Sequence, residues 1–167
     1  MENQTSESVS IISENEKNVS AFIHISTFLK YFFPLGNFIA PIVLWTLNKE
    51  KPFVDVHGRG AINFQLSIFL YTLLIGLLCI PFFAIFATNF VSLVETLERH
   101  GNDFRLSDIQ HMTGYIILFG IAVCLLFGLF VLELYAVINA TMHAAKGKLY
   151  RYPICIPFLK TSTKNQH

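Results

Sequence analysis

Four polar side chains, His57, Arg59, Asn63 and Gln65, stand where an apolar segment begins, in the stretch VDVHGRGAINFQ over residues 54–65. An imidazole and a guanidinium can bind an anionic group. The amides can instead form hydrogen bonds between membrane helices, each contributing roughly 0.6–2 kcal/mol. Arg59 and Asn63 are four residues apart and share a helix face. The stretch therefore offers either binding chemistry or a polar lock between helices.

Two later segments carry groups that would reach the same place. Asn139 lies near the end of the last apolar segment, and Tyr150 and Tyr152 follow it in the C-terminal tail. We predict that these segments converge on one polar cluster, the functional face of the protein, made of His57, Arg59, Asn63, Gln65, Asn139, Tyr150 and Tyr152. The alternative is that the cluster only locks helix ends together.

Glu133 is a charged residue inside the last apolar segment. A charge in the hydrocarbon region is costly and is usually paired or functional. Its candidate partners are Lys30 and His24, in the first apolar segment. The pattern favours an interhelical ion pair or a protonated carboxyl. A step in an ion path is the alternative, although such a path needs a chain of similar groups.

Metal and catalytic sites are not indicated. The 6 histidines form no H-x3-H pair and no cluster with cysteine, so neither a metal nor another cofactor is expected. No aspartate lies inside an apolar segment, and no serine has a suitably placed histidine, so we expect no catalytic residue. The cysteines Cys79, Cys124 and Cys155 are expected to be inert thiols.

The composition indicates a membrane protein. The chain has 167 residues, 53% of them hydrophobic and only 14% charged, with a mean hydropathy of +0.53. Soluble domains carry about 25% charged residues. No basic patch is interleaved with aromatic residues, so nucleic acid is not an expected partner.

Hydropathy predicts an all-α membrane protein with three transmembrane helices. The first, residues 19–47, is broken at Pro34-Leu35-Gly36, and a re-entrant hairpin is the alternative for it. The second covers residues 61–87, and the third covers 112–141. Between them, Phe90, Leu93, Val94 and Leu97 follow helical spacing and predict a separate amphipathic helix near 90–100.

Local signals predict where the last helix begins and ends. Ser107 and Gln110 match a capping box, and Gly147 suits the left-handed residue that ends a helix. A stripe of small residues at four-residue spacing along this helix could pack against the chain itself or a second copy. This small-residue stripe consists of Gly120, Cys124 and Gly128, then Ala136, Ala140 and Ala144. We expect a disordered tail over 1–18, one helical membrane domain over 19–159, and a polar tail over 160–167.

The distribution of lysine and arginine predicts the orientation. Most of these residues lie in the 48–60 loop and after the last apolar segment, whereas only a few flank the connection at 88–111. Loops rich in Lys and Arg stay cytoplasmic. We therefore expect a multi-pass inner-membrane protein with a cytoplasmic C-terminus. A basic rim would contact anionic lipid headgroups, at ~1 kcal/mol per charge; it consists of Arg59, Lys146, Lys148 and Arg151.

Three segments carry a family resemblance: AFIHIS, the run NFIAPIVLWTLNKEKPFVDVHGRGAINFQLSI, and INATMHAAKGKLYRYPICIPFL. They resemble a bacterial family of small membrane proteins. That family is itself distantly similar to the twenty-kilodalton membrane subunit of the chloroplast inner-envelope protein translocon. The resemblance covers about residues 21–87 and 113–159. It implies no catalytic residues.

The function expected from these features is non-enzymatic. We expect a subunit or accessory factor of a membrane complex, translocon-like or related to transport, with an unidentified membrane protein as partner. The alternative is a small homo-oligomeric transporter or channel. An intramembrane enzyme is a third and weaker hypothesis, because the apolar segments carry so few reactive side chains.

Overall fold

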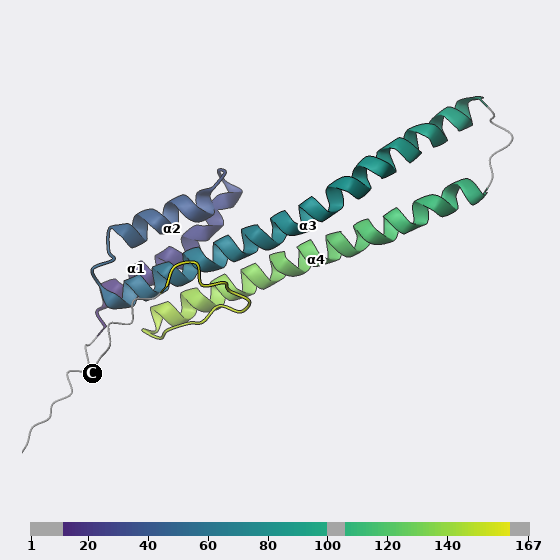
Figure 1. The fold of residues 1–167 in the computed structure, drawn as a ribbon. Helices are drawn as coiled ribbons and strands as arrows, with labels where there is room; N and C mark the ends of the chain where they lie inside the picture. Colours follow the sequence, from purple (N-terminus) through teal and green to yellow (C-terminus); the bar gives the residue numbers. More distant parts are fainter. Residues whose placement is uncertain (1–11, 100–105, 161–167) are drawn as a thin grey trace, which may run out of the picture. The chain divides into compact units, whose positions relative to one another are not determined.

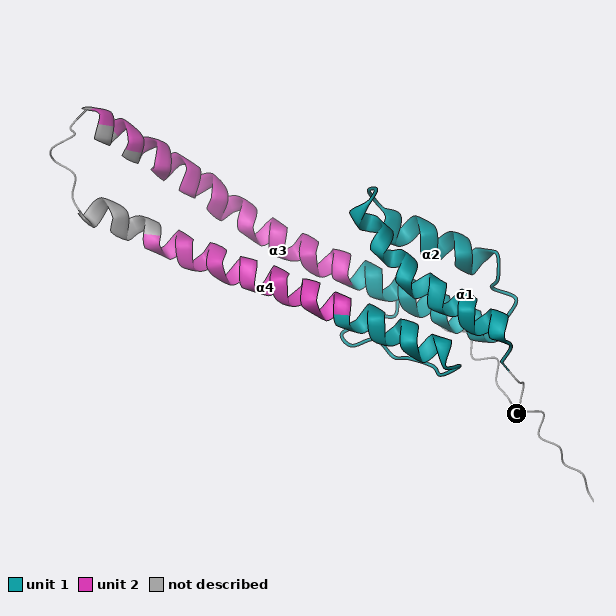
Figure 2. Cartoon of the chain, turned by 180° about the vertical axis from the view of Figure 1, so that it is seen from behind, with its two compact units in different colours: residues 1–67, 135–167 teal, residues 68–134 magenta. Residues whose placement is uncertain are grey.

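The computed structural model describes residues 12–99 and 106–160, and within them the only regular structure is helical. The chain forms two compact units (Figure 2). Unit 1 holds residues 1–67 and 135–167, and unit 2 holds residues 68–134. The two long helices contribute to both units, whereas the short N-terminal helices belong to unit 1 alone.

Helix α1 (Glu14–Ile25) begins where Ser13 caps it. The Ser13 hydroxyl accepts a hydrogen bond from the Glu16 backbone N–H at 3.3 Å. The Glu16 carboxylate in turn accepts from the Ser13 N–H at 2.9 Å. This capping box satisfies backbone donors of the first turn. It therefore makes part of the segment 1–18 helical, where composition alone predicts disorder.

The N-terminal segment folds as a helical hairpin (Figure 1). A 3₁₀ helix, η1 (Ser26–Tyr31), continues α1, and α2 (Gly36–Thr46) runs back beside it. The turn depends on Leu35, which adopts the left-handed conformation with φ of 61°. It also depends on Gly36, where an added Cβ would lie 2.5 Å from the Leu29 carbonyl carbon. The break predicted at Pro34–Gly36 is confirmed.

This hairpin corrects the prediction of three spans. Helix α2 has 11 residues, about 16 Å at 1.5 Å per residue, against a hydrocarbon core of about 30 Å. Helix α2 is therefore too short to cross a membrane. Within residues 12–99 and 106–160, two helices are long and apolar enough to do so, over Pro52–Ser92 and Thr113–Ala145, and neither belongs to the first apolar segment.

Helix α3 (Pro52–Arg99) begins with a proline, which suits the first helical position because its missing N–H would have no helical partner there. The separate amphipathic helix predicted near 90–100 is wrong, because α3 runs through that region without a break. No Gly or Pro interrupts residues 82–99. The Thr88 hydroxyl donates back to the Ile85 carbonyl at 2.8 Å, so it does not cap a new helix.

Helix α4 (Leu106–Ala145) begins before Ser107, so that residue lies inside the helix and not at the predicted N-cap. Its other end is as predicted. Gly147 has a φ of 68°, and its N–H donates to the Ala144 carbonyl at 2.9 Å. The Lys148 N–H donates to the His143 carbonyl at 2.9 Å. This pair of bonds is the Schellman arrangement that satisfies the last carbonyls of a helix.

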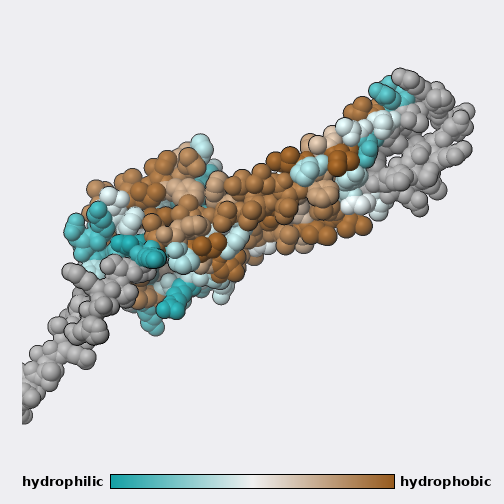
Figure 3. Space-filling model, viewed as in Figure 1, coloured by the Kyte–Doolittle hydropathy of each residue, from teal (hydrophilic) through white to brown (hydrophobic). Residues whose placement is uncertain are grey.

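Unit 2 exposes apolar side chains along both of its helical segments (Figure 3). Its α3 and α4 segments pack through aromatic rings: Phe86 contacts Tyr115 and Phe119 edge-on, with centroids 5.9 and 5.8 Å apart. Exposed apolar surface of this extent is expected where lipid is the solvent. The exposed residues include Leu77, Leu78, Phe83, Ile116, Val123 and Phe127.

Unit 1 has a conventional apolar core. Ile23 of α1 packs with Val54 and Ala61 of α3, and Leu44 and Trp45 of α2 pack against them. Three alanines of the small-residue stripe, Ala136, Ala140 and Ala144, are also fully buried. In unit 2 the stripe is different, because Cβ atoms added at Gly120 and Gly128 would meet open space.

Candidate functional site

Three side-chain rings, joined by hydrogen bonds, link three segments of unit 1. This ring chain consists of His24, His57 and Tyr152. His24 Nε2 lies 2.7 Å from His57 Nδ1, and the Tyr152 hydroxyl lies 2.8 Å from His24 Nδ1. His24 and His57 are 1% and 3% exposed. The segments meet here because Tyr152 stacks on the buried ring of Phe64, with centroids 4.3 Å apart and planes 15° from parallel.

The hydrogen bonds of this chain can run in either direction. If the Tyr152 hydroxyl donates to His24, then His24 donates to His57; if His57 donates instead, His24 donates to the tyrosine oxygen. Burial, and next the neighbouring His57 ring, hold the pKa of His24 well below its ordinary value. The His24 ring is therefore neutral near pH 7. The ring chain can shift a proton between tautomers, or it can simply join the three segments.

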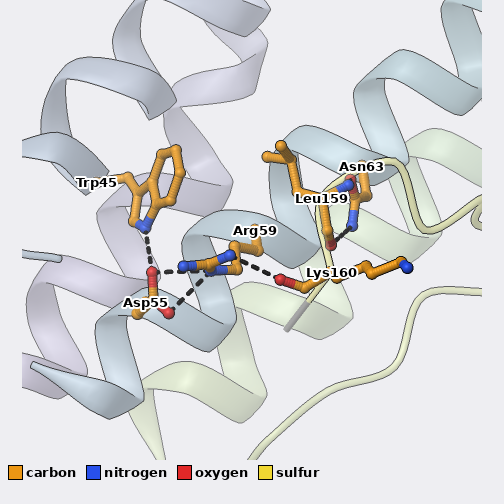
Figure 4. Close-up of polar contacts among 6 residues, drawn as sticks. All are labelled: Trp45, Asp55, Arg59, Asn63, Leu159 and Lys160. Carbon is orange, nitrogen blue, oxygen red and sulfur yellow. Dashed lines mark hydrogen bonds and ion pairs between the residues drawn. The ribbon is translucent and has the colours of Figure 1, made fainter. Parts of the chain in front are cut away.

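A row of polar residues at four-residue spacing on α3 forms a second polar feature: Asp55, Arg59, Asn63 and Ser67. Figure 4 shows all of them except Ser67. Arg59 Nη1 donates to the Lys160 carbonyl at 2.7 Å. Asn63 donates to the Leu159 carbonyl at 3.0 Å and accepts from its N–H at 2.7 Å. The Ser67 hydroxyl accepts from the Ile156 N–H at 2.8 Å. These bonds fasten the C-terminal tail (residues 148–160) to α3.

Asp55, the first residue of this row, joins α3 to α2 (Figure 4). Its carboxylate accepts from Arg59 Nε at 2.9 Å and from Trp45 Nε1 at 2.9 Å. Trp45 can lie so close to α3 because residue 58 is glycine, where a Cβ would overlap the indole. Farther along α3, Asn37 Nδ2 donates to Gln65 Oε1 at 3.0 Å. Both ends of α2 are thus hydrogen-bonded to α3.

The residues predicted from sequence are placed as follows. His57, Arg59, Asn63 and Gln65 lie together on α3 in unit 1, with Tyr152 beside them. Tyr150 packs edge-on against Tyr152 at 5.2 Å and also contacts the His143 ring. Asn139 does not join them, because its amide donates to the Tyr135 carbonyl of its own helix at 2.8 Å.

The residues proposed as a buried ion pair have these surroundings. Glu133 is 3% exposed. Both ring nitrogens of His24 are engaged by His57 and Tyr152. The Lys30 ammonium lies 5.2 Å from the centre of the Tyr31 ring. Pairing of Glu133 with Lys30 or His24 stays a prediction.

Sequence reasoning missed Asp55, Ser67, Trp45 and Asn37 as members of the network. The signal for the first two was the four-residue spacing 55-59-63-67, which places polar groups on one face of a helix. Nothing local identifies the other two, because their partners lie on another helix. Among the described residues, no group of three or more His, Cys, Asp or Glu side chains could hold a metal ion.

Comparison with protein families covers nearly all of this arrangement, since residues 15–159 match the magnetosome magnetite crystal formation protein family. The chain belongs to this family. Membership of the MamF/MmsF family confirms the resemblance to small bacterial membrane proteins. No comparison links the chain to the chloroplast translocon subunit. Comparisons with curated proteins and with solved structures give no match.

The part shared with the MamF/MmsF family includes the N-terminal hairpin, both long helices and almost all of the C-terminal tail. It therefore contains the ring chain and the residues of α3 that hold the tail. Lys160, whose carbonyl accepts from Arg59, lies just outside the matched residues. The family places the protein among membrane proteins that act in a larger process. Its description does not specify translocation or transport.

Proposed function

We propose that this protein is a non-enzymatic subunit or accessory factor of a membrane complex, anchored by α3 and α4. The observation that carries the proposal is that the polar groups of unit 1 bind other segments of the same chain. His24, His57 and Gln65 are 1–3% exposed, which is a poor position for meeting a diffusing substrate. Groups used in this way make unit 1 a fixed platform whose outer surface can dock on another protein.

The proposal places this platform on the cytoplasmic side of the inner membrane. The sequence has 12 Lys and Arg residues, and with two spans only Arg99 and Arg105 fall on the far side, which leaves ten on the side of unit 1. Short segments rich in Lys and Arg remain cytoplasmic. Both chain ends would then be cytoplasmic, because a pair of spans returns the chain to its starting side.

Anionic lipid headgroups are part of the proposed surroundings. Lys146, Lys148 and Arg151 are exposed beside the end of α4 and can attract such headgroups at ~1 kcal/mol per charge near the surface. Arg59 is not included, because its guanidinium is engaged by Asp55 and by the Lys160 carbonyl.

Cross-linking in intact membranes tests the proposal. An amine-reactive cross-linker should join exposed lysines of unit 1 to one defined membrane protein, which mass spectrometry would identify. The lysines are Lys49, Lys146, Lys148 and Lys160. Their replacement by arginine is the matched control, because it keeps the charge, and with it lipid attraction, but removes the reactive amine. The cross-link should then disappear while abundance stays unchanged.

The competing function is a homo-oligomeric transporter or channel. The exposed small residues Gly120, Cys124 and Gly128 of α4 favour it, because they would let the helix of a second copy approach closely. Cross-links found only between copies of this chain, together with ion conductance in liposomes of the purified protein, would replace the first proposal with this one.

A further inference from the structure

The N-terminal hairpin (α1, η1 and α2) has a polar base and an apolar tip. Residues 31–47, which form the tip and α2, include no Asp, Glu, Lys or Arg. The base carries Glu14, Glu16 and Lys17 at the start of α1, and Lys49 to Lys51 just after α2. Polarity therefore falls along the axis of the hairpin, as it does from the headgroups of a bilayer toward its centre.

The tip and the outer face of α2 are exposed although they are apolar. Phe32 is 84% exposed and Leu35 is 61% exposed. On α2 and at its C-cap, four more apolar side chains are at least 40% exposed: Ile39, Ile42, Val43 and Leu47. At 100° per residue, these four fall within one broad face of the helix. A water-facing surface helix would carry polar residues on such a face.

Polar side chains near the tip are turned inward. The Thr27 hydroxyl donates to the His24 carbonyl at 2.8 Å, and the Ser26 hydroxyl donates to the Ile23 carbonyl at 2.8 Å. The Asn37 amide donates to Gln65. Segments in lipid must satisfy their donors internally in this way, because no water is available. Lys30, with its ammonium over the Tyr31 ring, has a side chain long enough to reach the interface.

The hydrogen bonds between α2 and α3 show how far along α3 the tip of the hairpin reaches. Trp45, at the base, is bonded to Asp55, and Asn37, beside the tip, is bonded to Gln65. The tip is thus level with Gln65 of α3, which is buried.

We propose that the hairpin inserts its tip, Tyr31 to Leu35, into the near leaflet of the bilayer without crossing it, with the exposed face of α2 against lipid. The occupant of this surface is lipid, because the tip and α2 carry no charged residue, whereas charged residues gather at the base, which would lie at the level of the headgroups. Helix α2 is about 16 Å long, roughly half the hydrocarbon thickness, so the hairpin enters and leaves on the same side. The inference does not depend on the function proposed above.

Site-directed spin labelling in liposomes tests the insertion. The three cysteines, Cys79, Cys124 and Cys155, are first replaced by alanine in the full chain. Single cysteines are then introduced as Phe32→Cys at the tip and Val43→Cys on α2. Leu77→Cys in α3 is the lipid-exposed control, and Lys49→Cys is the water-exposed control. Collisions of each nitroxide with oxygen, which partitions into lipid, and with a water-soluble nickel chelate are compared.

The expected result is an order of depth. The label at position 32 should shift from nickel access toward oxygen access, to a value between those at positions 77 and 49, and the label at 43 should be shallower than that at 32. Equal nickel access at 32 and 49 would overturn the proposal. So would spin–spin broadening at 32 that disappears when unlabelled protein is added, since a second copy would then cover the tip. Exclusion of both reagents would point to a protein partner instead.

Discussion

Asn63 binds the backbone of Leu159 through both ends of its side-chain amide. The amide nitrogen donates to the Leu159 carbonyl at 3.0 Å, and the amide oxygen accepts from the Leu159 N–H at 2.7 Å. The two residues are 96 positions apart in the chain. A single side chain thereby satisfies a donor and an acceptor of an irregular tail, which has no secondary structure to satisfy them.

We predict that Asn63→Ala releases the end of the C-terminal tail from α3. Two hydrogen bonds would be lost, at about 0.5–1.5 kcal/mol each, so the free energy of unfolding should fall by about 1–3 kcal/mol. The Leu159 amide should exchange with deuterium faster than in the unaltered protein, whereas the Ile156 amide, bonded to Ser67, should change less.

Asn139→Ala is the matched control for this experiment. The Asn139 side-chain amide donates to a carbonyl of its own helix, at Tyr135, so its removal should leave exchange in the C-terminal tail unchanged. Unaltered protection of Leu159 in the Asn63→Ala protein would contradict the proposed attachment.

The close approach of η1 and α2 predicts that Gly36 cannot be enlarged. In Gly36→Ala the new Cβ would meet the Leu29 carbonyl carbon at 2.5 Å, and that atom belongs to the backbone, which cannot rotate away. Overpacking of this kind costs about 1–3 kcal/mol. Thermal unfolding in detergent should show a lower midpoint. Gly76→Ala is the control, because its Cβ would meet no atom within 4 Å; equal midpoints for both variants would reject the prediction.

The buried His24 predicts a loss of stability in mild acid. Burial, and then the His57 ring, lower the pKa of His24 well below its ordinary value of 6.5. The unfolded chain therefore takes up a proton near pH 6.5 that the folded chain does not. The stabilisation is fully present above that pH and falls as the pH drops below it, by up to ~1.4 kcal/mol per pH unit.

Thermal unfolding between about pH 7.5 and pH 5 measures this dependence. His24→Gln removes the titrating group and keeps an amide that can accept or donate a hydrogen bond. The variant should be less stable at neutral pH but should lose less stability on acidification. Parallel pH profiles for the two proteins would show that His24 does not contribute.

The topology predicts that both chain ends lie on one side of the membrane. In a cysteine-free chain, Glu14→Cys, Lys49→Cys and His167→Cys should resist a membrane-impermeant maleimide in intact cells and react after permeabilisation. Asn102→Cys, in the connection between the two spans, should react in intact cells. Glu14 and Lys49 are exposed, so burial would not explain their protection. Reaction at position 14 but not at 167 would restore the model with three spans.

Local features of the chain are visible in the sequence because they depend on neighbouring residues only. The apolar runs within α3 and α4 are long enough to predict two spans from length and hydropathy. Gly147 predicts the end of α4, because glycine adopts a positive φ without steric cost. Pro34 and Gly36 predict the break in the first segment for similar reasons. The amphipathic pattern near 90–100 predicts a separate helix, whereas α3 is continuous to Arg99, because no Gly or Pro interrupts residues 82–99.

Tertiary structure decided which polar groups bind one another. The sequence indicates that Asn63, His24 and Tyr152 need partners, because polar groups are costly to bury alone. It does not identify those partners, since they depend on which segments pack together. Asn63 meets the tail backbone and not Asn139, and His24 meets His57 and Tyr152. These contacts form because α2 and the C-terminal tail fold back onto the first turns of α3.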